Sequence, residues 1–373
     1  MAAPVTPAEA RVRAEIARRG PILFEEVVEI ALYDPVGGFY ATGGAAGRRG
    51  DFLTSPEVGP LFGAVVAAAL DRWWAEAACP SRFAVVEAGA GTGALARSIL
   101  AAQPACSAAL RYVLVERSDI QRLGHARHLA LEDPAAAFAS APAADEDHHD
   151  IAAFPPVGPI VVSMADLPRL PGPVIVLANE LLDNLPFGLT ERTADGWAEV
   201  RVGITDDRLA EVLVPVVAGA LPKARVGARV PTFRAAARWV REARELAGSG
   251  GRVVAFDYAS TLGGLAARPW TEWVRTYRQH ARGGAPLEGL GTQDITCEVP
   301  IDALTPSPVV CTQAEWLERN GLDDLVAEAR SLWQERAAIG DLAALRARSR
   351  VSEALALVDP TGLGAFRVLE WQT

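Results

Sequence analysis

Short apolar runs recur through the middle of the chain. Five of them have the length and the composition of buried strands: Phe83 to Ala88, Tyr112 to Glu116, Ile160 to Ser163, Val174 to Ala178 and Arg252 to Tyr258. Helical or loop sequence separates most of these runs. Strands that alternate with helices in this way predict an α/β fold with a doubly wound parallel sheet.

Helical patterns dominate the first part of the chain. Helices are predicted over Pro7 to Arg19, Leu23 to Tyr33 and Leu61 to Trp74, with glycine-rich turns between them. Residues 1–78 are therefore predicted to form an N-terminal helical cap or lid that precedes the sheet.

The rest of the chain divides by the same patterns. Residues 79–264 are predicted to form the Rossmann-like core, with a β-hairpin near 197–214. Residues 265–349 are helix-rich and are predicted to be a helical insertion. Residues 350–373 are predicted to return to the core sheet, with Phe366 to Trp371 as its last edge strand.

The strand at Phe83 to Ala88 runs directly into a glycine-rich turn. Glycines stand at positions 89, 91 and 93, and the helix-forming run Ala94 to Leu100 follows them. Such a turn lets the backbone approach a ligand closely, with the amide groups at the start of the helix facing it. We therefore predict a nucleotide-cofactor site at Gly89, Gly91 and Gly93. The alternative is a purely structural turn.

The spacing of these glycines distinguishes between cofactors. Dinucleotide-binding turns favour G-x-G-x-x-G, which would need a glycine where Ala94 stands. The chain instead reads E-x-G-x-G-x-G, with Glu87 two residues before the first glycine. This form resembles motif I of the class I S-adenosylmethionine (SAM) methyltransferases. The predicted cofactor is SAM, and the predicted fold is the Rossmann-like sheet of that class with a helical cap and a helical insertion.

Two further groups of polar residues follow predicted strands, at the sheet edge where ligands bind in open α/β folds. Glu116 ends the second strand, where an acid can accept hydrogen bonds from both ribose hydroxyls. NAD would use the same arrangement, and a surface acid is the other interpretation. Asn179, Glu180 and Asp183 follow the fourth strand.

Glu180 and Asp183 stand three residues apart and would share one face of a helical turn. Two carboxylates can hold a cation, and a guanidinium matches their geometry. Asn179 would then hold the cofactor or a substrate amine. The alternative is a helix start whose acids complement the helix dipole, with Pro186 as its stop.

Composition excludes several classes of function. The 373 residues are half hydrophobic and carry a formal charge of −10, which argues against nucleic acid as the main partner. The four cysteines lack CxxC spacing, and His148-His149 lies in an Ala/Pro-rich stretch that is typical of a solvated loop, so no metal site is predicted.

No apolar segment approaches the length of a membrane span, and the start of the chain lacks the apolar core of a signal peptide. The arginines near the start could mimic a transit peptide, but Glu9 and Glu15 interrupt that pattern. The predicted location is the cytoplasm, with a mitochondrial address as the alternative.

Several motifs together carry a family resemblance. The segment Gly50 to Glu57, read alone, could be only a turn in which Ser55 caps a helix. The chain also contains these segments in order: Gly20 to Glu26, Ala31 to Tyr40, Leu61 to Gly63, Glu87 to Gly93, Ala178 to Asp183, Leu185-Pro186, Phe256 to Tyr258, Gly291 to Thr296 and Thr312-Gln313. This series resembles the MidA/NDUFAF-type protein arginine methyltransferase family over most of the chain.

The resemblance implies a SAM-dependent enzyme that methylates arginine in a protein, with a respiratory-complex or other assembly client as the partner. It implies that Gly89, Gly91, Gly93 and Glu116 bind SAM, and that Gly50 to Glu57, including Thr54, Ser55 and Pro56, closes over the cofactor. It also implies that Asn179, Glu180 and Asp183 border the methyl-transfer site. Glu180 is the first candidate for holding the guanidinium.

Three positions depart from the family pattern. Ala64 replaces an acid, Ala259 replaces a glycine, and Phe187 to Leu189 is apolar where a histidine and a polar residue are usual. These departures leave open a small-molecule methyltransferase of the same fold or a SAM-binding assembly factor with little catalysis. An NAD-dependent oxidoreductase is disfavoured by Ala94.

Overall fold

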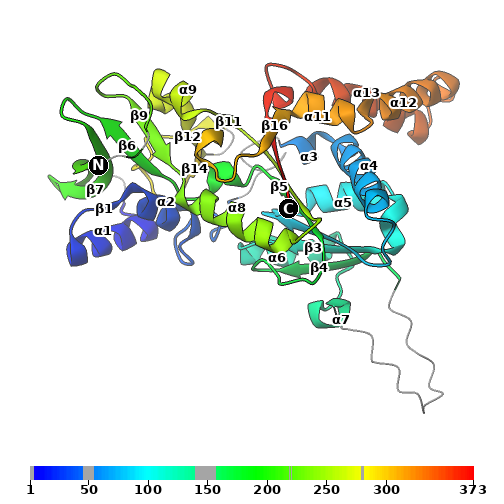
Figure 1. The fold of residues 1–373 in the computed structure, drawn as a ribbon, viewed down its shortest axis with the longest axis horizontal. Helices are drawn as coiled ribbons and strands as arrows, with labels where there is room; N and C mark the ends of the chain where they lie inside the picture. The colour runs from blue at the N-terminus through cyan, green and yellow to red at the C-terminus, as the bar shows by residue number, and fades with distance from the viewer. Residues whose placement is uncertain (1–3, 45–53, 139–156, 218, 220, 279–280) are drawn as a thin grey trace, which may run out of the picture.

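A seven-stranded sheet forms the centre of the molecule (Figure 1). The computed structural model describes residues 4–44, 54–138, 157–217, 219, 221–278 and 281–373. In the order of the sheet, the strands are β16 (Val309–Thr312), β17 (Arg367–Gln372), β10 (Arg252–Asp257), β5 (Val174–Asn179), β2 (Phe83–Ala88), β3 (Leu110–Val115) and β4 (Ile160–Met164). This doubly wound sheet confirms the predicted α/β fold.

The strand order places the switch point of the sheet between β2 and β5. From β2 the chain proceeds outward through β3 to β4, all in parallel, and then returns to pair β5 with the other side of β2. The carboxyl ends of β2 and β5 therefore flank a crevice, which is where ligands bind in such sheets. The five strands predicted from apolar runs agree with the observed ones to within two residues at each end.

The segment Phe366 to Trp371 does form a strand, but the prediction that this strand lies at the edge of the sheet is wrong. β17 pairs antiparallel with β10 on one side and with β16 on the other, so it lies inside the sheet. β16 is only four residues long and Val309 is exposed, so its sequence lacks the alternation that marks a half-buried strand.

A second, antiparallel sheet lies beside the first. Its strands are β1 (Ile22–Leu23), β6 (Gly188–Arg192), β7 (Trp197–Thr205), β8 (Arg208–Val216) and β9 (Arg229–Thr232). β7 and β8 form a hairpin that pairs Trp197 with Val216 and Thr205 with Arg208. Because β1 pairs with β7, the start of the chain is part of this sheet.

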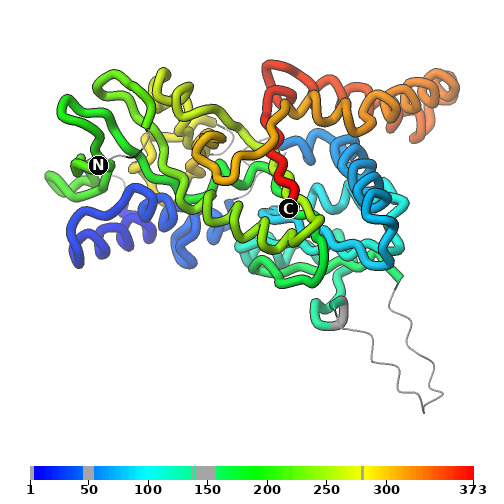
Figure 2. The backbone as a smooth tube through the Cα atoms, in the orientation of Figure 1, coloured from blue at the N-terminus to red at the C-terminus, as the bar shows by residue number. Residues whose placement is uncertain are grey.

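The first 78 residues do not form one separate cap, since they supply β1 to the second sheet and helices to both parts of the molecule. Helices α1 (Pro7–Arg19) and α2 (Phe24–Tyr33) pack on the second sheet, whereas α4 (Pro60–Glu76) packs on α5 (Ala94–Ala101) beside the core sheet. The short α3 (Ser55–Val58) leads into α4. Figure 2 shows the blue start of the chain in the left part and the red β17 near the centre.

Strands also occur in residues 265–349, so the prediction of a helical insertion is incomplete. A three-stranded sheet contains β13 (Ala281–Arg282), β12 (Val274–Arg278) and β14 (Asp294–Cys297). β15 (Val299–Pro300) pairs with β11 (Ala259–Ser260). Strands this short are stabilised by distant partners and leave little local pattern.

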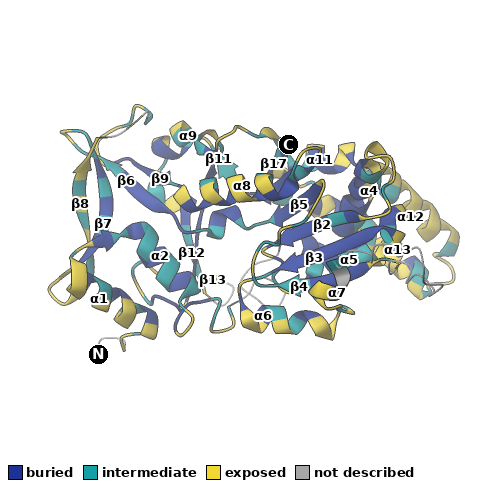
Figure 3. Cartoon of the chain, turned by 60° about the horizontal axis from the view of Figure 1, so that its bottom comes forward, coloured by how far each residue is buried: buried dark blue, intermediate teal, exposed yellow. Residues whose placement is uncertain are grey.

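The remaining helices are α6 (Asp119–Gly124), α7 (Pro134–Phe138), α8 (Arg234–Ala247), α9 (Leu262–Ala267), α10 (Trp270–Trp273), α11 (Gln313–Arg319), α12 (Leu322–Arg336) and α13 (Leu342–Leu357). Most of them lie beside the core sheet, whereas α9 packs on β9 of the second sheet and α10 precedes β12. The central strands are buried, while α12 and α13 form a hairpin whose surface is largely exposed (Figure 3). Among the described residues, the structure contains no helix long and apolar enough to cross a membrane.

Candidate active site

The glycine-rich turn joins β2 to α5 at the switch point. Gly89, Gly91 and Gly93 have φ angles of +67°, +54° and +74°, in the left-handed region that favours glycine. A Cβ atom on Gly89 would lie 2.9 Å from the Leu181 side chain. The turn therefore needs glycine, and its backbone lies against the chain that leaves β5.

Glu116, which follows β3, holds this turn. Its Oε2 accepts a hydrogen bond of 2.9 Å from the N–H of Gly91, and its Oε1 accepts one of 2.7 Å from the N–H of Ser118. Burial raises the pKa of Glu116, and the two backbone hydrogen bonds oppose that rise. Glu116 lies at the strand end predicted for the ribose-binding acid.

Glu87 lies beneath the turn, in β2. The hydroxyl of Tyr112 donates a hydrogen bond of 2.6 Å to Glu87 Oε2, and both side chains are buried. Burial raises the pKa of Glu87 to about 7. Glu87 is therefore a buried acid next to the turn, and it also lines the adjoining cavity.

A cavity of about 450 Å³ opens beside the turn, within the range of about 300–1,000 Å³ for small-molecule sites. Its lining includes most residues predicted to bind the cofactor, namely Thr54, Pro56, Glu87, Gly89, Gly91 and Glu116, and also Asn179 and Glu180 from the predicted methyl-transfer site. Oδ1 of Asn179 is buried and has no hydrogen-bond partner among the described residues. A glycine turn, an acid at the next strand end and an unpaired amide oxygen fit an adenosyl cofactor. We refer to this space as the cofactor cavity.

Ser55 and Gly93 do not line the cofactor cavity. Ser55 is fully buried in α3, and its hydroxyl donates a hydrogen bond of 2.9 Å to Gln313 Oε1. Gly93 forms the start of α5 instead. The predicted closing segment Gly50 to Glu57 begins outside the described residues, which resume at Thr54.

A smaller cavity of about 40 Å³ adjoins the first and shares four lining residues with it, Tyr40, Thr54, Glu180 and Asn184. We refer to it as the inner pocket. Asp183, Asp294 and Glu298 also line it, together with Tyr258, Trp273 and Arg275. Glu180 and Asp183, which follow β5, both line this pocket. They do not share the helical turn predicted from their spacing, because Glu180 precedes the short helix Leu182–Asn184 and has a left-handed backbone.

Glu180 lies between the two cavities in an unusual backbone conformation. Its φ angle is +50°, and its N–H donates a hydrogen bond of 2.8 Å to the carbonyl of Phe256 in β10. Non-glycine residues in this region are strained and are held by their surroundings, often at functional sites. Burial and the nearby Asp183 raise the pKa of Glu180 to about 8, against hydrogen bonds from Asn179, Tyr258 and Ser55.

Asp183 is only 3% exposed, and its Oδ1 has no hydrogen-bond partner among the described residues. Burial, and then Asp257 and Asp294, raise its pKa well above the usual value. An unpaired buried carboxyl oxygen is costly unless a cation or a donor reaches it. The inner pocket therefore suits a cationic donor.

Asp257 at the end of β10 builds the turn that carries these acids. Its Oδ2 accepts hydrogen bonds of 2.8 Å from the N–H of Leu182 and 3.3 Å from the N–H of Asp183. Its Oδ1 accepts one from the N–H of Tyr258. Burial and Glu180 raise the pKa of Asp257 to about 8.

The sequence reasoning assigned no role to Asp257, Tyr258, Asp294 or Tyr40. Asp257 and Tyr258 follow a predicted strand, so the rule that found Glu116 and Glu180 could have found them. Asp294 accepts hydrogen bonds from Tyr40 at 3.2 Å and Asn184 at 3.0 Å. Tyr40 and Asp294 lie within segments that carry the family resemblance, but they are far apart in sequence and only the fold brings them together.

The fold and the two cavities define a methyltransferase of the Rossmann-like class. Residues 65–316 match a family described as "Putative S-adenosyl-L-methionine-dependent methyltransferase", and the chain belongs to this family. A candidate methyl transferase from Burkholderia thailandensis, crystallised with S-adenosyl-homocysteine, is similar with a TM-score of 0.76 and 26% identity. That alignment covers 98% of this chain and 92% of the other. SAM is therefore the cofactor of this family.

Named relatives are mitochondrial proteins. The chain is 27% identical to protein arginine methyltransferase NDUFAF7 of Rattus norvegicus over 80% of this chain and 69% of the relative. It is 30% identical to NDUFAF7 of Homo sapiens over 57% of this chain and 49% of the relative. A Drosophila melanogaster homologue is 41% identical over 24% of this chain and 21% of the relative.

The chain thus spans between about a fifth and two thirds of the length of these three relatives. The prediction of a cytoplasmic location is wrong by this comparison, because the relatives are named as mitochondrial.

No group of three or more histidine, cysteine or acidic side chains that could hold a metal ion occurs in the part of the chain that the structure describes. His148 and His149 lie outside those residues.

Proposed function

We propose that this chain transfers methyl groups from SAM to a guanidinium nitrogen of arginine in a protein, with a respiratory-complex or other assembly client as substrate. The observation that carries the proposal is the unpaired, buried Oδ1 of Asp183 beside Glu180, in a pocket that adjoins the cofactor cavity. The names of the relatives support the same acceptor.

The inner pocket matches a guanidinium in charge and in geometry. A guanidinium is planar, carries five N–H donors and binds carboxylates through paired hydrogen bonds. Glu180 and Asp183 supply carboxyl oxygens from one turn, and the ring of Tyr258 lines the same pocket. A bound guanidinium would stabilise the ionised carboxylates and reverse the rise of their pKa values.

Glu180 is the group proposed to act during transfer. When bound, SAM supplies a methyl group on its sulfonium, and S-adenosylhomocysteine leaves as the N–CH3 bond forms and the S–CH3 bond breaks. An arginine nitrogen is a poor nucleophile while its guanidinium keeps every proton. Glu180 orients the guanidinium and accepts the proton that the nitrogen loses, and Asp183 holds the opposite side.

The three departures from the family pattern lie outside both cavities. Phe187 and Leu189 are fully buried, and Phe187 packs on Phe24 and Phe233 with ring centroids 5.8 and 6.1 Å away. Ala64 and Ala259 do not line either cavity. Because none of these positions lines a cavity, the departures give little support to the alternative of a SAM-binding protein without catalysis.

The test is transfer of label from methyl-labelled SAM to the proteins of a cell extract, followed by mass spectrometry of the labelled peptides. We expect methylarginine with the wild-type protein and a large loss with Glu180→Gln, whose SAM affinity should change little. Label on another residue type, or equal labelling by the variant, contradicts the proposal. Calorimetric SAM binding shows whether the variant retains its cofactor site.

A further inference from the structure

Arg275 is the only cationic side chain among the described residues that line the inner pocket. It comes from β12, on the side of the pocket that faces Tyr258, whereas Glu180 and Asp183 come from the turn after β5. The arginine acceptor proposed above does not use it. A cation beside a cation-binding pocket needs a separate explanation, because it repels the acceptor that the pocket binds.

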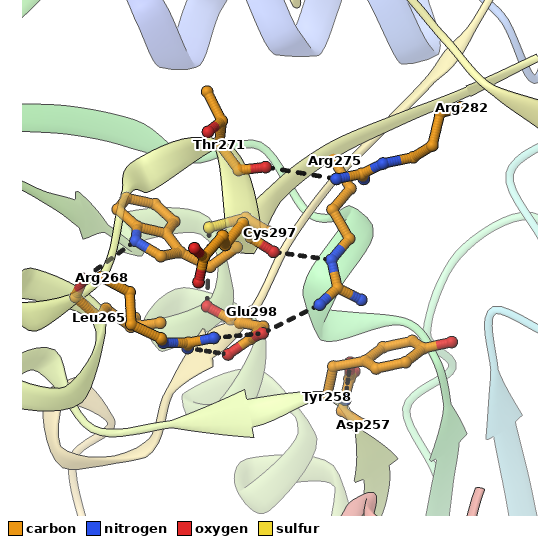
Figure 4. Close-up of polar contacts among 11 residues, drawn as sticks. Asp257, Tyr258, Leu265, Arg268, Thr271, Arg275, Arg282, Cys297 and Glu298 are labelled. Carbon is orange, nitrogen blue, oxygen red and sulfur yellow. Dashed lines mark hydrogen bonds and ion pairs between the residues drawn. The ribbon is translucent and has the colours of Figure 1, made fainter. Parts of the chain in front are cut away.

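Two hydrogen bonds fix the guanidinium of Arg275. Its Nε donates a hydrogen bond of 2.8 Å to the carbonyl of Glu272, and its Nη2 lies 3.3 Å from Glu298 Oε1. Glu298 is also held by Arg268, whose Nη2 lies 2.6 Å from Oε2. Figure 4 shows this chain of contacts, with Arg268 on one side of Glu298 and Arg275 on the other.

The free end of Arg275 is available to a ligand. Its Nη1 makes no hydrogen bond with any described residue, and the side chain is 31% exposed. In Figure 4 this end of the guanidinium points away from Glu298, on the side where Tyr258 lies. A guanidinium that is already oriented loses little freedom when it pairs with a carboxylate, which it can bind through two parallel hydrogen bonds.

We propose that Arg275 binds a carboxylate of the acceptor, so that the enzyme prefers an arginine with an acidic group close to it. This inference rests on the proposed function. The acceptor guanidinium lies at Glu180 and Asp183, and its neighbouring carboxylate pairs with Nη1 of Arg275. The substrate is then a zwitterionic segment that places its guanidinium at Glu180 and Asp183 and its carboxylate at Arg275.

Two sources can supply this carboxylate. One is an aspartate or glutamate next to the target arginine in a protein segment, and the other is the α-carboxylate of free arginine. The test uses acetylated and amidated nonapeptides with a central arginine in a Gly/Ser background. Each carries one Asp, or the isosteric Asn, at a position within two residues of the arginine, and free arginine is a separate arm.

We expect the wild-type enzyme to favour at least one Asp peptide over its Asn partner by about tenfold in kcat/KM, the effect of one charge-assisted hydrogen bond. Arg275→Gln should reduce that ratio to about one. Arg268→Gln is the matched control, because Arg268 contacts the same Glu298 but does not line the pocket, and it should keep the preference.

If the enzyme prefers free arginine to the peptides and loses this preference in Arg275→Gln, the pairing with Arg275 is supported and the partner is the α-carboxylate. Equal rates for Asp and Asn peptides with the wild-type enzyme overturn the inference, as does an equal loss of preference in both variants. Absence of methylarginine from every peptide, from free arginine and from the extract overturns the proposed function itself, which is a different result.

Discussion

Three buried carboxyl groups, those of Glu180, Asp183 and Asp257, have raised pKa values. A carboxyl group whose folded-state pKa is raised binds a proton in the folded protein at pH values where the unfolded chain has released it. Its stabilising contribution is therefore complete below the unfolded pKa of 4.5 and is lost as pH rises through the folded value of about 8 for Glu180.

The free energy of unfolding of Glu180→Gln, relative to that of the wild type, should therefore increase as pH rises. Near pH 5 the variant resembles the protonated wild-type protein, whereas near pH 9 it avoids the buried charge. Urea unfolding of the protein without SAM, at about pH 5 and about pH 9, measures this difference in the free energy of unfolding.

Glu15→Gln is the matched control for the pH experiment. The nearby Arg18 lowers the pKa of Glu15, so its contribution is present above the unfolded pKa and is lost as pH falls. The control should show no gain at high pH. A pH-independent difference between Glu180→Gln and wild type would mean that Glu180 is not the buried, protonated group inferred here.

His125 contacts the same residue of the glycine-rich turn as Glu116, namely Gly91. It is fully buried, with Nε2 2.8 Å from the carbonyl of Gly91 and Nδ1 2.9 Å from Ser163 Oγ. A carbonyl only accepts, so Nε2 carries the proton and Nδ1 accepts from the Ser163 hydroxyl. Burial lowers the pKa of His125, which keeps the ring neutral in this role.

Replacing His125 by Phe should weaken SAM binding by about tenfold, because the Gly91 carbonyl loses its donor while the ring volume is kept. Calorimetric titration with SAM measures the change. Ser163→Ala removes only the distant partner of the ring and should have a smaller effect. SAM binding by His125→Phe with wild-type affinity would show that Glu116 alone fixes the turn.

At the scale of elements, α3 is held by two helices that are distant in sequence. The Ser55 hydroxyl donates to Gln313 Oε1 at 2.9 Å, and Gln313 Nε2 donates to the carbonyl of Leu357 at 3.1 Å. Gln313 is fully buried at the start of α11, and Leu357 ends α13. Because α3 also carries Pro56 and follows Thr54, this bond positions part of both cavities.

Gln313→Met should lower the free energy of unfolding by about 1–3 kcal/mol, since it leaves two buried polar groups unpaired at nearly the same volume. It should also reduce turnover. Glu315→Ala is the control, because it removes the capping box of α11 but leaves the contact between Gln313 and Ser55. Unfolding and labelled-SAM assays should show that only Gln313→Met loses both stability and turnover. If Gln313→Met loses stability but keeps its turnover, the position of α3 does not affect the active site.

The sequence predicted those elements whose signal is local. Phe83–Ala88 matches β2 at both ends because an apolar run meets glycine directly. Glu180 and Asp183 were found because polar residues follow a strand at the switch point. The inner pocket also needs Asp294, which is 254 residues from Tyr40 and 110 from Asn184, and only tertiary packing brings these together. Likewise β16 depends on its pairing with β17, and no local pattern marks it.

At the scale of the whole molecule, the two larger sheets share one hydrophobic core. A continuous cluster of buried side chains joins residues of the second sheet, such as Leu189 and Val200, to residues of the core sheet, such as Val176 and Val253. Helices α1, α2 and α8 contribute to the same cluster. The two sheets should therefore unfold together, although they differ in topology and strand direction.

Phe187→Ala tests this cooperativity at a core residue that does not line the cofactor cavity. Phe187 is fully buried in the shared core, and truncating a buried phenylalanine costs about 3–5 kcal/mol. Calorimetry should show one unfolding transition in the wild type, and the same single transition at a lower temperature in the variant. SAM should move this transition to a higher temperature in both proteins, because a ligand stabilises every part that unfolds together with its site. Two transitions, of which SAM moves only one while Phe187→Ala moves only the other, would show that the sheets are independent units.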